Sequence, residues 1–115
     1  MEVYMVSTKW MEDNCLLIYE DDILAGTGKL VFVDGKYFVE NVNIKEEFRG
    51  KSYGELAVRM LVRRAVNMGA EKTYANIDKS IVKLFEKIGF YKREETDNGD
   101  YVMCMEGDVG GHCCK

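Results

Sequence analysis

The chain has 115 residues, which suits one domain with a modest core. Hydrophobic residues make up 47%, charged residues 31%, and proline is absent, a composition that excludes an intrinsically disordered chain. The net charge of −4, the lack of a long apolar run and the lack of a signal-peptide pattern argue against nucleic-acid and membrane partners, so we expect a cytoplasmic protein.

The first part of the chain is expected to form antiparallel strands. A short strand at residues 3–6 is followed by Trp10, which we expect to pack over an edge. Residues 15–20 read as a buried strand, and residues 23–33 as the next one. Two glycines in the middle of that longer strand weaken it or mark a bulge. Asp34-Gly35 between apolar runs then predicts a tight hairpin.

A strand, a basic loop and a long helix follow the hairpin. The strand covers residues 37–44, and the helix ends at Gly69, where a residue without a Cβ suits a helix C-terminus. A turn that leads into a helix presents unpaired backbone N–H groups and the positive end of the helix dipole. This pattern predicts an anion site that suits a diphosphate, although two surface glycines in an ordinary turn would look the same. The loop consists of Arg49, Gly50, Lys51, Ser52, Tyr53 and Gly54.

The second half of the chain is expected to complete a mixed sheet. Residues 71–77 read as a strand parallel to the one before the loop, because a helix joins the two. Asp78 is the candidate N-cap of a second helix, with Ser80 as the alternative. Residues 90–95 and 101–106 form two further strands, which a polar turn with a glycine joins.

These elements make one domain with a short tail. We predict an α/β (α+β) fold over residues 1–107, with a mixed, mostly antiparallel sheet and two main helices. Residues 108–115 are expected to form a flexible tail in which Cys113 and Cys114 follow His112. Because these three residues are adjacent and lack a distant second pair, we expect two reactive thiols and no metal site.

The loop and its neighbours resemble those of the GNAT N-acetyltransferase superfamily. The coenzyme A loop of that family reads Arg or Gln, two residues, Gly, one residue, then Gly or Ala. Arg49 and Gly54 match the outer positions, whereas Ser52 stands at the middle glycine. The resemblance runs from about residue 15 to residue 106 and includes residues 84–90 (LFEKIGF), which are similar to the family's second helix and its Gly-Phe exit. It implies a single GNAT-like domain that binds acetyl-coenzyme A.

The resemblance also implies which residues hold the cofactor. The backbone N–H at Ile44 is expected to meet the thioester carbonyl, and the pyrophosphate to lie over the loop. Phe85 stands where many members carry a tyrosine that protonates the departing thiolate, which argues for weaker acid catalysis. The implied cofactor-binding residues are Val42, Ile44, Arg49, Gly50, Lys51, Ser52, Tyr53, Gly54, Asp78 and Phe85.

Glu40 is the candidate catalytic base. It lies on the same strand parity as Phe38, Val42 and Ile44, so its carboxylate is expected to point toward an apolar face, as a base that works near neutrality requires. Residues 39–42 also resemble the strand that carries a catalytic Glu in some polyamine-type members of the family. The alternative is a glutamate at a bulge that faces solvent or pairs with a lysine.

Two functions follow. The first is an acetyl-coenzyme A-dependent N-acetyltransferase that acts on a primary amine of a small molecule or a protein. The second is a non-catalytic GNAT-like module that binds coenzyme A or a partner protein. The two helices that the family places between its first strands have no room here, so we expect an acceptor side that is open or that a homodimer completes. A third is a redox- or metal-responsive role of the tail at residues 108–115.

Overall fold

Seven strands and two α-helices make up the described part of the chain, residues 5–107 of the computed structural model. The strands are β1 (Val6–Met11), β2 (Cys15–Glu20), β3 (Ile23–Val33), β4 (Lys36–Ile44), β5 (Lys72–Ile77), β6 (Tyr91–Glu95) and β7 (Tyr101–Glu106). The helices are α1 (Tyr53–Asn67) and α2 (Val82–Ile88), and the short 3-10 turns are η1 (Glu12–Asn14), η2 (Glu46–Phe48) and η3 (Lys79–Ile81).

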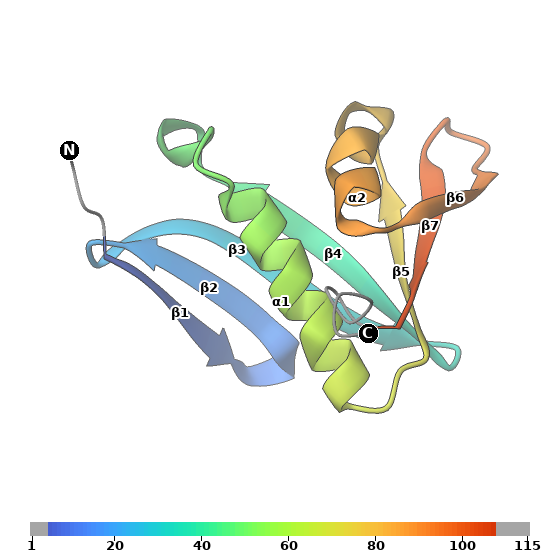
Figure 1. Cartoon of the computed structure of the whole chain (residues 1–115), viewed down its shortest axis with the longest axis horizontal. Coiled ribbons are helices and arrows are strands. Elements are labelled where there is room, and N and C mark those ends of the chain that lie inside the picture. Colours follow the sequence, from blue (N-terminus) through green and yellow to red (C-terminus); the bar gives the residue numbers. More distant parts are fainter. Residues whose placement is uncertain (1–4, 108–115) are drawn as a thin grey trace, which may run out of the picture.

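All seven strands belong to one sheet, in the order β1-β2-β3-β4-β5-β7-β6. Only the β4–β5 pair is parallel, because α1 carries the chain back between these two strands. Figure 1 shows α1 crossing the sheet diagonally over β3 and β4, with α2 beside it near β5. The predicted mixed, mostly antiparallel sheet with two main helices is confirmed.

The turns explain why several predicted boundaries agree with the structure. Asp34 and Gly35 have φ values of 53° and 78°, and a type I′ hairpin turn needs positive φ at both central residues. Gly69 has a φ of 103° just beyond the end of α1, in agreement with the predicted helix C-terminus. The predicted bounds of β2, β3 and β7 are those observed.

The prediction for the first strand is wrong in its position. The observed strand β1 runs from Val6 to Met11, and Trp10 lies within it. It pairs with β2 because η1 reverses the chain at once, with Asp13 and Asn14 in the left-handed region at φ values of 62° and 60°. Residues 1–4 and the predicted tail at residues 108–115, with its cysteines, lie outside the described residues.

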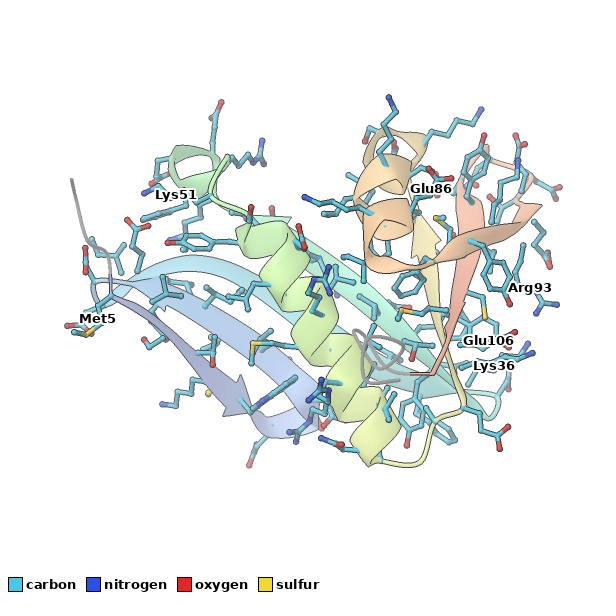
Figure 2. The ribbon with its side chains drawn as sticks, in the orientation of Figure 1. Met5, Lys36, Lys51, Glu86, Arg93 and Glu106 are labelled. Atoms are coloured by element: carbon cyan, nitrogen blue, oxygen red, sulfur yellow. The ribbon has the colours of Figure 1, made fainter. Side chains whose placement is uncertain are left out.

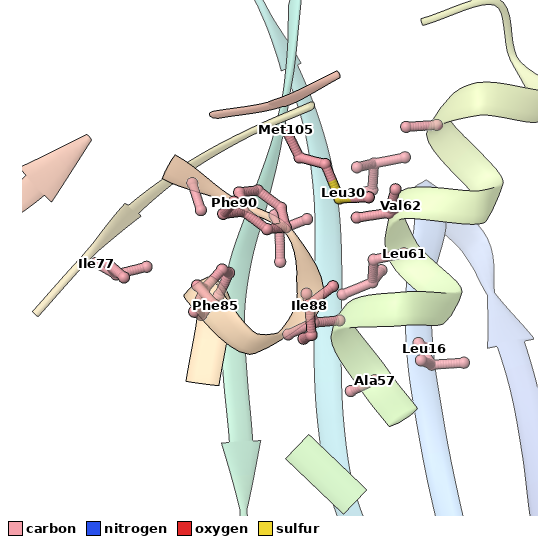
Figure 3. Close-up of a cluster of buried hydrophobic side chains, with 14 of the residues drawn as sticks. Leu16, Leu30, Ala57, Leu61, Val62, Ile77, Phe85, Ile88, Phe90 and Met105 are labelled. Atoms are coloured by element: carbon pink, nitrogen blue, oxygen red, sulfur yellow. The ribbon is translucent and has the colours of Figure 1, made fainter. Parts of the chain in front are cut away.

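The core lies between α1, α2 and one face of the sheet (Figure 3). Leu61 and Val62 of α1 are fully buried and pack with Leu16 and Leu30 of the sheet. A Cβ atom at Gly28 would lie 2.9 Å from Cδ1 of Leu61, so this glycine lets α1 approach β3 closely. Among residues 5–107, no helix is long and apolar enough to cross a bilayer.

Candidate functional site

A pocket of about 580 Å³ lies where β4, the loop after it, the start of α1 and the η3–α2 segment meet. It exists because β4 and β5 pair only over residues 37–39 and 73–75 and separate beyond them (Figure 1). Both strands therefore leave backbone groups unpaired along the gap. The predicted site residues that line this pocket are Val42, Ile44, Arg49, Gly50, Ser52, Tyr53, Gly54 and Phe85.

A smaller cavity of about 140 Å³ lies next to this pocket in the gap between β4 and β5. Val42, Ile81 and Phe85 border both spaces, so the two are neighbours. Glu40 and Asp78 line the smaller cavity. The structure thus brings every predicted site residue except Lys51 to one of two adjoining spaces.

A bulge in β4 overturns the predicted parity of Glu40. Asn41 has a φ of 56°, and the register between β3 and β4 shifts between Thr27 and Lys29. The extra residue reverses the alternation of side chains. Val39 before the bulge and Val42 after it consequently both face the core, whereas Glu40 points to the opposite face. The prediction that Glu40 shares a face with Val42 and Ile44 is therefore wrong, although its half-buried side chain still borders the smaller cavity.

The loop places two residues in the left-handed region just before α1. Gly50 has a φ of 86°, and Ser52 has a φ of 66° with a ψ of 22°. The Ser52 side chain makes no capping hydrogen bond to the helix. A Cβ atom at Gly50 would meet nothing within 4 Å, so its surface is open. The main chain here can approach a ligand, and Ser52 adopts a conformation that favours glycine.

Replacing Ser52 with glycine is expected to raise the free energy of unfolding by up to about 1 kcal/mol. Relief of the left-handed strain (~1–2 kcal/mol) exceeds the added entropy cost of a glycine (~0.5–1 kcal/mol). Urea denaturation measures the change, and Ser7→Gly in the exposed strand β1, where φ is not positive, should instead be destabilising. Affinity for coenzyme A should stay equal or improve; a large loss would show that the Ser52 hydroxyl is a ligand.

Arg49 braces the loop against the end of β4. Its Nε donates a hydrogen bond to the backbone oxygen of Ile44 at 3.0 Å. The guanidinium is exposed and lines the pocket, so it adds positive charge at the start of α1. This places a cation and a helix N-terminus at the same wall, which suits an anionic ligand.

Lys51 turns away from the pocket and holds the loop to β2. Its Nζ lies 2.9 Å and 3.1 Å from the two carboxylate oxygens of Glu20, and the hydroxyl of Tyr53 also donates to Glu20. Figure 2 shows Lys51 on the loop near the start of α1. Sequence reasoning missed Glu20, which has the same parity as the buried residues Leu16 and Ile18 and is itself 6% exposed. A carboxylate at a strand position that faces the core indicates a charge that is paired in the folded protein.

The hydrogen bond from Tyr53, with the hydrogen bond and charge of Lys51, holds the pKa of the Glu20 carboxyl below its ordinary value of 4.5. A lowered pKa stabilises the fold above the ordinary value, and this contribution is lost as the pH falls through the lower folded value. Glu20→Gln should therefore be less stable than the natural protein at neutral pH, and the difference should shrink below pH ~4.5.

Urea denaturation at several pH values tests this expectation for Glu20. The control is Glu86→Gln, which changes an exposed carboxylate on α2 and should leave the pH dependence unchanged. A stability difference between Glu20→Gln and the natural protein that stays constant from neutral pH to pH ~3 would contradict the assignment.

Ion pairs and caps fix the α2 side of the pocket. Glu55 in the first turn of α1 pairs with Lys87 of α2 at 3.1 Å and with Arg59 at 3.0 Å. Asp78 accepts a hydrogen bond from the backbone N–H of Ser80 at 2.7 Å, which lowers the pKa of the Asp78 carboxyl. The predicted cap at Asp78 is confirmed, with the difference that it begins the 3-10 turn η3 before α2.

Comparison with known proteins places these features in a family context. The model of the acetyltransferase (GNAT) family matches residues 2–90. The chain is 34% identical over 76 residues to the uncharacterized N-acetyltransferase YobR of Bacillus subtilis, covering 64% of this chain and 31% of that protein.

Solved structures share the fold at lower identity. PaiA N-acetyltransferase from Thermoplasma acidophilum, in complex with coenzyme A, matches with a TM-score of 0.71 at 20% identity over 81% of this chain and 60% of its own. A GNAT family acetyltransferase from Elizabethkingia anophelis with acetyl-coenzyme A bound matches with a TM-score of 0.71 at 15% identity, over 81% and 75%.

Proposed function

Because the chain belongs to the acetyltransferase (GNAT) family, we propose that it is an N-acetyltransferase that transfers the acetyl group of acetyl-coenzyme A to a primary amine. The observation that carries the proposal is the pocket between the separated strands β4 and β5, with the loop and the N-terminus of α1 at its wall. The chain spans 31% of the length of YobR. Because the matched protein is much longer, N-acetyltransferase activity is proposed for this chain and not transferred from YobR.

The residues present fit coenzyme A at this pocket. Main-chain N–H groups at the start of α1 would bind the pyrophosphate, with the positive end of the helix dipole and Arg49 nearby. Val42 and Ile44 give the end of β4 an apolar surface for the acyl-bearing arm, and the Ile44 N–H would meet the carbonyl oxygen. The complexes of PaiA with coenzyme A and of the Elizabethkingia anophelis enzyme with acetyl-coenzyme A support this choice of cofactor.

Bound acetyl-coenzyme A would supply a thioester as the acyl donor. The protein itself would hold the amine beside the thioester and accept a proton from the amine. Positioning the two reactants can lower the barrier by ~7–11 kcal/mol. Phe85 has no hydroxyl, so this side chain cannot protonate the departing thiolate. We place the acceptor side where Glu40 and Asn76 border the smaller cavity. We also propose that a second copy of the chain completes the acceptor side in a homodimer. The proposed location is the cytoplasm.

Glu40 is the proposed base, and Glu40→Gln should lower turnover by about 100-fold or more. Gln keeps the shape of the side chain but cannot accept a proton from an ammonium group. The assay measures coenzyme A release with a panel of primary amines. Calorimetry should show acetyl-coenzyme A affinity within about twofold of the natural protein, because Glu40 lies outside the larger pocket.

The matched control is Glu94→Gln, an exposed carboxylate on β6 that should keep full turnover. Unchanged turnover in Glu40→Gln would remove Glu40 as the base. Lost cofactor binding in that variant would instead move Glu40 into the cofactor site.

A non-catalytic module that binds coenzyme A is the second candidate function. The observation that favours it is Phe85 at the pocket wall, where a tyrosine would supply an acid. Cofactor binding without coenzyme A release against any amine of the panel would support this alternative and contradict the enzyme.

A further inference from the structure

Three apolar side chains surround the place where the pocket and the smaller cavity meet. Among the described residues, only Val42, Ile81 and Phe85 border both spaces. We call these three residues the neck. The smaller cavity beyond the neck is polar on its acceptor side, because the carboxylate of Glu40 and the amide of Asn76 border it. The neck is therefore a short apolar passage between the pocket and a polar space.

Two members of the neck are fixed by the core. Phe85 is 1% exposed and packs edge-to-face on Phe90, with the ring centroids 5.0 Å apart (Figure 3). Val42 packs against the core over Gly28, where a Cβ atom would lie 3.6 Å from Cγ2 of Val42. Close packing of this kind leaves a side chain little freedom to make way for a ligand. The width of the neck therefore depends on its third member.

Ile81 is the exposed member of the neck, with 37% of its surface accessible. Its main chain is held in the 3-10 turn η3, where its N–H donates a hydrogen bond to the backbone oxygen of Asp78 at 3.1 Å. Branching at Cβ restricts the Ile81 side chain to few rotamers. This side chain is thus positioned by its turn and not by the core, so it can be shortened with little loss of packing.

Under the proposed function, the acyl group of the donor would lie at the neck, because the pocket meets the acceptor side there. An acetyl group ends in a single methyl group, which an apolar ring of side chains can bury. A longer acyl chain must extend through the neck into the smaller cavity. That cavity has a volume of about 140 Å³ and is where we place the amine, so the chain and the amine would compete for it.

We propose that Ile81 determines the length of the acyl chain that the protein accepts, and that it selects acetyl over medium-length acyl groups. This inference rests on the proposed function, since it takes the pocket as the acyl-donor site. Replacing Ile81 with alanine would widen the neck and join the two spaces. In an apolar site, a difference of one methylene can change the preference between substrates by roughly 10–200-fold.

The test is calorimetric titration of the full chain with acetyl-coenzyme A, hexanoyl-coenzyme A and free coenzyme A. We expect the natural protein to bind hexanoyl-coenzyme A at least about tenfold more weakly than acetyl-coenzyme A. In Ile81→Ala this ratio should fall to about twofold or less, because the joined spaces accept the longer chain. Free coenzyme A has no acyl group and should bind both proteins within about twofold. The ratio compares two ligands on one protein, so a change in stability does not alter it.

The matched control is Ile23→Ala, which shortens a 57% exposed isoleucine at the start of β3 and should keep the natural ratio. A second variant, Ile81→Phe, narrows the neck and should weaken hexanoyl-coenzyme A further without changing the affinity for free coenzyme A. If free coenzyme A binds, equal affinity of the natural protein for both thioesters, or an unchanged ratio in Ile81→Ala, would overturn this inference alone. If free coenzyme A does not bind the natural protein, the proposed function and this inference both fail.

Discussion

Replacing Phe85 with alanine is expected to lower the free energy of unfolding by about 3–5 kcal/mol. Phe85 is 1% exposed, and its ring packs edge-to-face on Phe90 with the centroids 5.0 Å apart. The helix α2 has seven residues, of which Phe85 and Ile88 are buried, so its attachment to the core depends on these two side chains (Figure 3). Urea denaturation at neutral pH measures the loss.

Phe85→Met is the matched control, because a flexible side chain of similar volume refills most of the space and should cost less than about 1.5 kcal/mol. A loss below 1 kcal/mol in Phe85→Ala would contradict the packing described here, since truncation of a buried aromatic side chain cannot be that mild unless the site collapses. Because Phe85 also lines the pocket, the alanine variant should bind coenzyme A less tightly.

Replacing Gly54 with phenylalanine is expected to weaken acetyl-coenzyme A binding by about 100-fold, or roughly 2.7 kcal/mol. Gly54 lies in the first turn of α1 and lines the pocket. A Cβ atom there points toward Leu84 and Ile44, at 3.5 Å and 3.9 Å, and both residues also line the pocket. A phenyl ring at this position would occupy the space proposed for the cofactor, and the pocket opens to solvent, so the fold should survive.

Gly54→Ala is the control for steric filling. The same two distances are ordinary van der Waals contacts, so a methyl group fits without a shift. Acetyl-coenzyme A affinity should stay within about threefold, and the helix should gain up to about 1 kcal/mol of stability. Equal affinity of the alanine and phenylalanine variants would show that the cofactor binds elsewhere.

The elements that the sequence predicted well depend on local chemistry. Apolar alternation sets the bounds of β2 and β3, and the Asp34-Gly35 turn needs only two residues that tolerate positive φ. The order of strand, basic loop and helix likewise locates the pocket, because a helix N-terminus always presents its N–H groups. These features do not require knowledge of distant contacts.

The features that the sequence could not supply depend on tertiary packing. Asn41 takes a left-handed conformation inside an apparently regular strand, and this single residue reverses the face of Glu40. Phe38 and Val42 share a parity in the sequence, so the alternation of hydrophobic residues appears continuous across Asn41. In the structure the two side chains lie on opposite faces of the sheet because of the bulge. The partner of Lys51 was also out of reach, because Glu20 lies 31 residues earlier in the chain and meets Lys51 only in the folded sheet.

The most direct test of the account is calorimetric titration of acetyl-coenzyme A into the natural protein and into Gly54→Phe. We predict micromolar binding with one site per chain, reduced by about 100-fold in the variant. Absence of binding in the natural protein, or equal binding in both, would contradict the assignment of the pocket between β4 and α2 as the acyl-donor site.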